Sequence, residues 1–329
     1  MNKNTIVSII VPCYNYGRYV GETLDSLLTQ TFVDWECLVV DDGSKDNSGE
    51  VVQAYAKKDD RIKYIYQENK GLPGARNTGI QAAQGLYIQF LDADDILESE
   101  KLKEQVSYFE SHPEADFVYS GLMYFMDGEP DKLRYSPDWI NKPWTLRKSG
   151  KGKNLLKYLI ISSSIMPPMP LIKKSAIDRI GGFVDHLKSC EDWEFWLRCA
   201  NKNLTFHFLD KKNTRSLMRI HPSSMTKNRT IMLESMIEVR EHINKVVENE
   251  NLKKINKDFL VNDWIEFAIV KQEYHNKQIG ENYLLEKKNQ VNSKRISFFQ
   301  TLIKILSPQK SLIFLRLTRS FMKKKNNSN

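Results

Sequence analysis

The sequence predicts an α/β fold with a Rossmann-like, mostly parallel sheet flanked by helices, followed by a helical, basic C-terminal extension. Two observations support this fold class. Over residues 6–120, short apolar runs rich in β-branched residues alternate with amphipathic stretches, which is typical of βαβ units on a parallel sheet. From residue 230 onward the pattern is mostly helical, first mixed in charge and then basic and apolar.

The elements follow from these runs in chain order. The apolar runs that predict strands are 6–12, 35–42, 62–68, 86–92, 117–125 and 204–210. The amphipathic stretches that predict helices are 19–29, 48–58, 74–84, 99–111 and 154–161. In the fourth helix, Leu102, Val106 and Phe109 share one face, as helical spacing requires. Residues 127–165 otherwise form a long irregular segment, and the prolines of 166–170 exclude a helix or central strand because proline lacks an amide donor.

Composition limits the function without naming it. With 329 residues, 41% hydrophobic and 27% charged, the chain is an ordinary globular protein. Nine basic side chains and no acid lie within residues 291–329, so the formal charge of +8 resides in the tail and the rest is nearly neutral. The neutral body argues against a nucleic acid partner. The four cysteines show neither zinc-ligand spacing nor a disulfide framework.

Polar segments follow several of the expected strands. They are 12–15, 41–44, 67–77 and 92–95. In open α/β sheets, ligands bind beyond the carboxyl ends of the strands, so these segments meet at one edge. Each segment alone also fits an ordinary turn, since Asn, Asp, Gly and Ser dominate turns for conformational reasons. Four together, rich in acids, favour a binding site.

Three carboxylates, Asp92, Asp94 and Asp95, follow the fourth strand within four positions. Such hard oxygen ligands suit Mg²⁺ or Mn²⁺. Because Mg²⁺ takes one or two protein carboxylates and completes its shell with water and substrate phosphates, the cluster predicts a phosphate-bearing substrate. The alternative is that Asp94 and Asp95 only lead into the helix expected from Ser99, where acids favour the positive end of the dipole.

The same sheet edge offers groups for a nucleotide. Asp41 and Asp42 can accept hydrogen bonds from a base or ribose, while Lys70 and Arg76 offer cations to a diphosphate. Neither the G-x-G-x-x-G loop nor the Walker pattern is present, which disfavours dinucleotide oxidoreductases and P-loop NTPases.

The motifs SIIVPCYN, VVDDGSKDNS, NKGLPGARNTGIQAAQGLYIQFLDADD and GGFVDHLKSCEDWEFWLR resemble, in order and spacing, the family 2 glycosyltransferases of the GT-A fold. The resemblance covers roughly residues 6–226. It implies a GT-A domain over 1–226, with a nucleotide-sugar half over about 1–125 and an acceptor half over about 126–226. Residues 227–329 are then the helical, basic extension.

The resemblance also implies roles for residues of this chain. Asp42 would read the nucleobase, with Pro12 and Tyr14 lining it. Asp92 and Asp94 would form the D-x-D motif for ribose and metal, with Asp95 as an alternative ligand and His221 as a further one. Asp192 would be the catalytic base, beside Glu191. The full nucleotide-sugar set is Pro12, Tyr14, Asn15, Asp41, Asp42, Lys70, Arg76, Asp92 and Ala93.

The implied activity is that of an inverting, metal-dependent hexosyltransferase with Mn²⁺ or Mg²⁺ as cofactor. It would move a sugar from a nucleoside diphosphate sugar, taken as a UDP-sugar, to a hydroxyl of a saccharide or lipid-linked saccharide in surface polysaccharide or glycan biosynthesis. Two alternatives stay open, a sugar-nucleotide nucleotidyltransferase and a non-enzymatic protein that binds polyanions or membranes. Glu191 and Asp192 also fit a simple helix cap, and His221 an ordinary structural histidine.

The basic tail and the N-terminal apolar run provide the sequence evidence on where in the cell the protein lies. Ile296, Phe299 and Ile303 recur at helical spacing among basic residues, which fits either a helix on an anionic membrane surface or one packed against the protein. The N-terminal apolar run carries Pro12 and has no cleavage site, and no segment reaches the roughly 18 apolar residues of a membrane span. We therefore expect a cytoplasmic protein, peripheral on the inner face of the cell membrane if the tail binds lipid.

Overall fold

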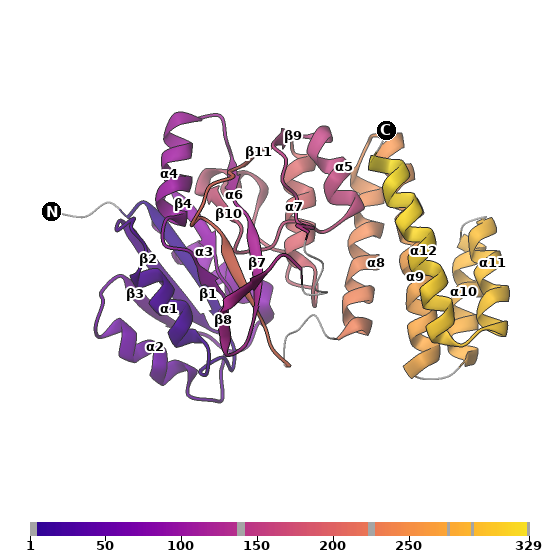
Figure 1. Ribbon diagram of the computed structural model, residues 1–329, viewed down its shortest axis with the longest axis horizontal. Helices are drawn as coiled ribbons and strands as arrows, with labels where there is room; N and C mark the ends of the chain where they lie inside the picture. The colour runs from indigo at the N-terminus through magenta and orange to yellow at the C-terminus, as the bar shows by residue number, and fades with distance from the viewer. Residues whose placement is uncertain (1–4, 137–141, 223–227, 275–276, 291–292, 328–329) are drawn as a thin grey trace. The chain divides into compact units, whose positions relative to one another are not determined.

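The computed structural model describes residues 5–136, 142–222, 228–274, 277–290 and 293–327. Two compact units make up the chain (Figure 1). The first contains the described residues within 1–159, 163–187 and 191–224, and the second those within 160–162, 188–190 and 225–329. The α/β fold class predicted from the sequence is confirmed.

The first unit is built on an eight-stranded sheet. Its order is β3-β2-β1-β4-β10-β6-β11-β9, and its strands are β1 (Val7–Cys13), β2 (Trp35–Asp41), β3 (Ile62–Tyr66), β4 (Tyr87–Phe90), β6 (Phe117–Tyr119), β9 (Gly150–Lys151), β10 (Pro170–Lys173) and β11 (Thr205–Phe208). Strands β3, β2, β1 and β4 run parallel, while β10 runs antiparallel to both of its neighbours. The parallel half reads as continuous apolar sequence because helices cover both of its faces.

Helices pack on both faces of this sheet. The first-unit helices are α1 (Val20–Leu28), α2 (Ser48–Ala56), α3 (Gly71–Ala82), α4 (Lys101–Ser111), α5 (Lys153–Ile161, whose last two residues belong to the second unit), α6 (Lys174–Ile180) and α7 (Glu191–Asn201). Val7, Ile9 and Val11 of β1 share a buried cluster with side chains of α1, α2 and α4. Ile10 points to the other face, where α3 lies so close that a Cβ at Gly79 would come within 2.3 Å of Ile10 Cγ2. The result is a three-layer arrangement of helix, sheet and helix.

A second, four-stranded sheet has the order β5-β12-β7-β8. Its strands are β5 (Ile96–Leu97), β7 (Leu122–Met126), β8 (Glu129–Arg134) and β12 (Ser216–Ile220). The single strand expected over 117–125 is therefore wrong: it is two strands, β6 and β7, in two different sheets. They separate at Ser120 and Gly121, where the Ser120 hydroxyl is buried and bonded to Lys101 and to the Thr214 carbonyl.

The proline segment 166–170 also differs from the prediction. Pro170 opens β10, which lies in the middle of the large sheet, and a proline is tolerated there because it is the first residue of the strand. The carbonyl of the preceding residue, Met169, is held by two buried side chains, the ammonium of Lys101 at 2.7 Å and the amide of Gln105 at 3.0 Å. The segment expected to be irregular contains β8 and β9.

The second unit is helical. It contains α8 (Arg229–Val246), α9 (Glu250–Tyr274), α10 (Lys277–Gln290), α11 (Lys294–Ile305) and α12 (Pro308–Asn327). Asn228 and Ser293 cap α8 and α11, each accepting a hydrogen bond from the backbone N–H three residues on. Its apolar core gathers around α9, with Trp264, Ile265 and Ile269 buried among side chains of the other four helices. In the part of the chain that the structure describes, no helix has the length and apolar character needed to cross a bilayer.

Candidate active site

The candidate site lies where β1, β2 and β4 end. Because the three strands are parallel and adjacent, their carboxyl ends meet at one edge, with Cys13 opposite Asp41 and Ile10 opposite Phe90. Asn15, Asp42 and Asp92 follow directly in the sequence. The prediction that these polar segments share one sheet edge is confirmed by this register.

The loop after β1 is bonded to the loop after β2. Asn15, with φ of +58°, accepts the Lys45 N–H at its side-chain oxygen at 2.7 Å, and its own N–H donates to the Ser44 hydroxyl at 2.9 Å. Asn tolerates this left-handed backbone better than most residues. Pro12 is buried and Tyr14 is 45% exposed, so this loop offers an accessible aromatic ring beside a fixed backbone.

The two aspartates after β2 have different surroundings. Asp41 accepts hydrogen bonds at both carboxylate oxygens, from the Ser44 N–H at 2.8 Å and the Tyr64 hydroxyl at 2.7 Å. Asp42 receives the Gln67 amide at 2.6 Å and the Lys70 N–H at 2.8 Å, both at Oδ1. Asp41 therefore holds the loop in place, and its contact with a base or ribose stays a prediction. Asp42 keeps Oδ2 without a hydrogen-bonding partner among the described residues.

Arg76 lies where the sequence did not predict it. Its side chain is 1% exposed and bridges two carboxylates, Asp92 Oδ1 at 2.8 Å and Glu191 Oε1 at 2.5 Å. The guanidinium is buried and already paired, so the expectation that Arg76 also offers its cation to a diphosphate stays a prediction. Arg76 joins the D-A-D segment after β4 to the start of α7. Lys70, by contrast, is exposed.

Glu191 and Asp192 open helix α7, directly after Cys190, whose φ is +59°. A non-glycine residue in this conformation is sterically disfavoured and fixes the direction in which the helix starts. Glu191 is buried against Arg76, whereas Asp192 is partly exposed. Although the residue is partly exposed, loss of water around its carboxyl group and the neighbouring Glu191 raise the pKa of Asp192 to about 7, and Arg76 opposes the shift. Asp192 is thus a carboxyl group that exchanges its proton near neutral pH.

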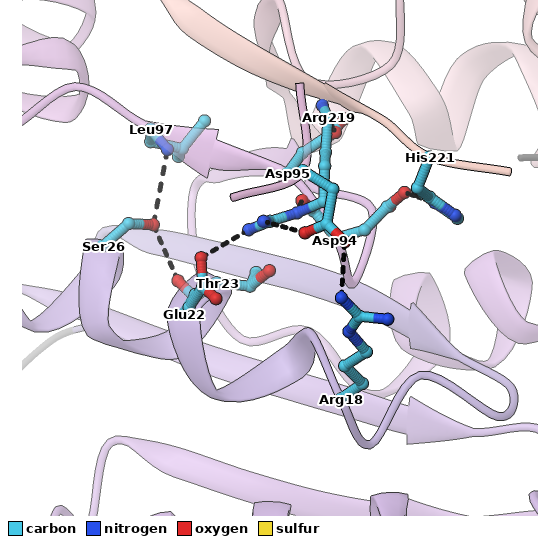
Figure 2. Close-up of polar contacts among 10 residues, drawn as sticks. Arg18, Glu22, Thr23, Ser26, Asp94, Asp95, Leu97, Arg219 and His221 are labelled. Atoms are coloured by element: carbon cyan, nitrogen blue, oxygen red, sulfur yellow. Dashed lines mark hydrogen bonds and ion pairs between the residues drawn. The ribbon is translucent and has the colours of Figure 1, made fainter. Parts of the chain in front are cut away.

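Asp94 meets a histidine from a distant part of the chain. Its Oδ2 lies 2.8 Å from His221 Nε2 (Figure 2). Strand β12 brings this about: it runs antiparallel to β5, with Leu217 opposite Ile96, so the residues after Leu217 pass alongside Asp95 and Asp94. The His221 side chain is fully buried, with its ring centroid 4.8 Å from that of Tyr19. Burial and the nearby Asp92 raise the pKa of Asp94.

The four expected metal ligands are not gathered into one cluster. Among the described residues, no group of three or more His, Cys, Asp and Glu side chains is arranged to hold an ion. Asp92 is paired with Arg76, and Asp95 is 2% exposed and accepts the Arg219 N–H at 3.1 Å. Burial and the two other aspartates raise the pKa of Asp95 well above its usual value. Asp95 thus uses Oδ1 within the turn, while its buried Oδ2 has no hydrogen-bonding partner among the described residues, and its role as an alternative ligand stays a prediction.

Asp94 and His221 nevertheless fit a divalent ion. A carboxylate oxygen and an imidazole nitrogen facing each other are a hard and a borderline donor, which suits Mn²⁺. Two protein ligands suffice when substrate phosphates and water complete the shell. Because the His221 side chain is fully buried and that of Asp94 is only 14% exposed, a cation there would offset a negative charge held largely away from water.

The sequence reasoning missed a set of charged side chains around this turn. They are Arg18, Glu22, Asp127 and Arg219. The available signal was that Arg219 lies two positions before His221, in the strand that His221 directly follows. The three aspartates are therefore balanced by protein cations, Arg76 and Arg219, as well as by any bound ion.

The family model described as Glycosyl transferase family 2 matches residues 8–181. GlyG of Streptococcus pneumoniae is 44% identical over 186 residues, which cover 53% of this chain and 59% of GlyG. The uncharacterized glycosyltransferase EpsJ of Bacillus subtilis is 43% identical over 143 residues, covering 44% of this chain and 40% of EpsJ. The putative teichuronic acid biosynthesis glycosyltransferase TuaG of the same species is 38% identical over 140 residues, 42% of this chain and 55% of TuaG. The chain thus matches less than two thirds of each of these relatives.

Solved structures agree with the fold. S. aureus TarS in complex with UDP-GlcNAc superposes with a TM-score of 0.67 at 20% identity, covering 97% of this chain and 92% of that one. The mannosyltransferase PcManGT from Pyrobaculum calidifontis, in complex with GDP-Man and Mn²⁺, gives 0.57 at 15% identity, covering 97% and 86%. These likenesses show the fold, and the family model covers more than half of the chain. The chain therefore belongs to glycosyltransferase family 2.

Proposed function

We propose that the protein transfers a sugar from a nucleoside diphosphate sugar, of which a UDP-sugar is the first candidate, to a hydroxyl of a saccharide or lipid-linked saccharide, with inversion at the anomeric carbon. The observation that carries the proposal is the connection through Arg76. One buried guanidinium holds both Asp92 of the D-A-D segment and Glu191, the neighbour of Asp192. The group suited to the donor and the group suited to the acceptor are thereby fixed relative to each other.

The donor side is formed by the loops after β1, β2 and β4. Asp42 offers one unoccupied carboxylate oxygen to a base N–H, beside Pro12 and the exposed ring of Tyr14. Asp92, 28% exposed, offers its second oxygen to a ribose hydroxyl next to Ala93. Lys70 is exposed at the start of α3, where a cation and helix N–H groups favour a diphosphate.

Asp94 and His221 would hold Mn²⁺ or Mg²⁺ together with that diphosphate. When bound, such an ion neutralises the charge that develops on a departing nucleoside diphosphate, so no protein general acid is needed. The contribution of the chain is to keep these two side chains buried and facing each other. PcManGT, whose structure contains Mn²⁺ and GDP-Man, shares the fold.

Asp192 would accept the proton of the acceptor hydroxyl. Its pKa of about 7 matches the operating range of a general base, which is worth typically 10² to 10⁴ in rate. A base that activates the attacking hydroxyl on the side opposite the leaving group gives a single displacement and inversion. Glu191 cannot take the same role as placed, because Arg76 holds it as a buried ion pair; it positions Asp192 and raises its pKa.

The relatives support a biological setting. TuaG is named for teichuronic acid biosynthesis, and we infer a role in the synthesis of a surface polysaccharide or related glycan, at the cytoplasmic side of the cell. The second unit supports contact with an anionic membrane: Phe298, Ile305, Ile313 and Phe314 of α11 and α12 are exposed, among basic residues and no acids. The side chains of Arg319 and of residues 323–325 lie outside the described part.

The test of the proposed function is a screen of nucleotide sugars. We expect one donor to raise the melting temperature in the presence of Mn²⁺, to be hydrolysed slowly, and to be consumed faster with an acceptor. Asp192→Asn should abolish transfer while leaving the affinity for the donor unchanged by titration calorimetry. Retained transfer in this variant would remove Asp192 from its role, and failure of every donor to bind would contradict the proposed function as a whole.

A further inference from the structure

A single arginine, Arg219, joins the Asp94–Asp95 turn to two other segments. Its side chain is 1% exposed. The guanidinium donates from Nε to the Asp94 carbonyl at 2.9 Å, from Nη2 to Glu22 of α1 at 2.6 Å, and from Nη1 to Asp127 after β7 at 3.1 Å. Its backbone N–H donates to the Asp95 carboxylate at 3.1 Å. Figure 2 shows the Arg219 side chain running from β12 past Asp95 towards Glu22.

The position of Arg219 in its strand links it to His221. Arg219 is the fourth residue of β12 and His221 follows the strand directly, so the end of this strand brings both residues to Asp94. Both meet Asp94: the guanidinium bonds its main-chain carbonyl, and the imidazole lies 2.8 Å from its carboxylate. One residue therefore fixes the backbone of Asp94, while the other contacts its side chain.

We infer that Arg219 is a positioning residue for the ion site. It sets the distance between the Asp94 main chain and β12, and with it the facing arrangement of Asp94 and His221. This inference rests on the proposed function, because it assigns Arg219 to the ion that the two side chains would hold. Arg219 itself would contact neither the ion nor the substrate, since each of its three guanidinium nitrogens already donates to Asp94, Glu22 or Asp127.

The chemistry of the contacts requires arginine rather than any cation. The three partners lie in three directions, and a planar guanidinium can donate to all of them at once from separate nitrogens. A lysine at the same place has one nitrogen and a flexible stem, so it can pair with Glu22 or Asp127 but cannot also hold the Asp94 carbonyl in a fixed direction. Arg219→Lys therefore keeps the charge and loses the geometry.

A purely structural arginine would behave differently, and the second unit provides one. Arg240 has a side chain that is 1% exposed, is ion-paired with Asp263, and donates to the Ile160 carbonyl at 2.9 Å and to Asn256 at 3.0 Å. It matches Arg219 in burial and, like Arg219, pairs with a carboxylate and donates to a main-chain carbonyl. Arg240→Met is thus the control for loss of stability without loss of ion-site geometry.

The experiment measures Mn²⁺ affinity directly, by calorimetric titration of Mn²⁺ into full-length protein saturated with UDP, well below the melting temperature of each variant. Supporting partners of a metal ligand typically change metal affinity 10- to 100-fold, so we expect Arg219→Met to weaken Mn²⁺ binding by about this factor. Arg219→Lys should show a smaller loss. Binding of UDP in the presence of EDTA should be unchanged in both, and Arg240→Met should keep the wild-type Mn²⁺ affinity.

The outcomes distinguish a failure of the proposed function from a failure of the role inferred for Arg219. If wild-type protein binds no Mn²⁺ with UDP, the proposed function fails, whatever Arg219 does. If wild-type protein binds Mn²⁺ and both Arg219 variants bind it equally well, this inference is overturned and the function stands. A matching loss in Arg240→Met would also overturn it, because the effect would then come from general destabilisation. If Arg219→Met proves unfolded by circular dichroism, the lysine variant decides.

Discussion

At the scale of single residues, the ionisation of Asp192 decides when the proposed reaction can run. A base must be unprotonated, and the pKa of about 7 means that most molecules carry a protonated Asp192 below that pH. We expect kcat/KM to rise with pH up to about 7 and to fall about tenfold per pH unit below it. The measurement is a pH profile from 5.5 to 8.5 at saturating Mn²⁺. A rate that stays level down to pH 5.5 would contradict a base with this pKa.

Arg76 determines where that pH limit lies. Its cation lowers the pKa of Asp192, while burial and Glu191 raise it. In Arg76→Met, the opposing influence is lost and Glu191 is left buried without its partner. We expect the acidic limb of the pH profile to move to higher pH, and the free energy of unfolding to fall by about 3 kcal/mol, as when one partner of a buried ion pair is removed.

The Arg76 prediction has its own control. Arg61 is an arginine paired with a single carboxylate, that of Asp59, and its side chain is partly exposed. It directly precedes β3, at the opposite end of the strand from the candidate site. Arg61→Met should leave the pH profile unchanged and cost less stability, since exposed pairs are worth little. A pH profile that is the same in Arg76→Met and wild type would show that Arg76 does not set the pKa of Asp192.

The sequence predicted which acidic residues lie close together, but not which basic side chains pair with them. Spacing along the chain placed Asp42, Asp92 and Asp94 at strand ends, and the structure has them there. The pairing of Arg76 with Asp92 and Glu191 depends on contacts across 16 and 115 positions, which no local pattern encodes. The burial of Asp95 was also unpredictable, because it depends on Arg219 of a strand 124 positions away.

At the scale of elements, the contact of α3 with β1 depends on one glycine. A Cβ at Gly79 would lie 2.3 Å from Ile10 Cγ2, within a sheet whose position is fixed by neighbours on both sides. We expect Gly79→Ala to lower the free energy of unfolding by about 1–3 kcal/mol, as overpacking of a core does. Urea unfolding followed by circular dichroism measures this. In the double variant with Ile10→Ala, the loss should be smaller than the sum of the two single losses, because the clashing atoms are removed.

Gly21 of α1 is the matched control for Gly79. A Cβ there would meet its nearest atom, the Tyr55 hydroxyl oxygen, at 3.5 Å, which is ordinary contact. Since alanine is favoured over glycine in a helix by about 0.5–1 kcal/mol, Gly21→Ala should be neutral or stabilising. If both substitutions cost the same, the close approach of α3 to β1 is not the reason.

The strands could be predicted where the apolar run was long. The prediction failed where pairing with distant strands determines the bounds of a strand. β1 and β2 were predicted within one residue of their observed bounds. The run 117–125 looked like one strand because Ser120 and Gly121 do not interrupt it strongly, yet each half pairs in a different sheet. β12 carries Arg219 and alternates buried and partly buried residues, and its identity as a strand is fixed by its partners β5 and β7.

At the scale of the whole molecule, the uneven charge distribution makes the proposed membrane contact testable. Ile305 and Ile313 are 75% and 60% exposed on the basic helices α11 and α12. We expect replacement of both by serine to reduce flotation of the protein with phosphatidylglycerol vesicles several-fold. Binding of the wild type should weaken with added salt, because the attraction to anionic lipid is screened. Phosphatidylcholine vesicles should bind much less.

A pair of residues in the first unit controls for exposed apolar area. Val33 and Leu86 are 56% and 66% exposed, and their replacement by serine should leave flotation unchanged. An equal loss of flotation in both double variants would mean that vesicle binding depends on exposed apolar area anywhere on the protein. No flotation of the wild type at low salt would show that α11 and α12 do not bind lipid.

The place of β10 in the sheet also sets the order in which the protein can be completed on the ribosome. β3, β2, β1 and β4 are all encoded before residue 91, so their half of the sheet can assemble early. β6 emerges next but has no neighbour in that half, because β10 separates it from β4. About eighty further residues of nascent chain must therefore be made after β4 before the two halves can join, which takes roughly 4–16 s at ordinary rates of synthesis. During that interval β4 presents an unpaired edge, which can pair wrongly with another strand until β10 has been made.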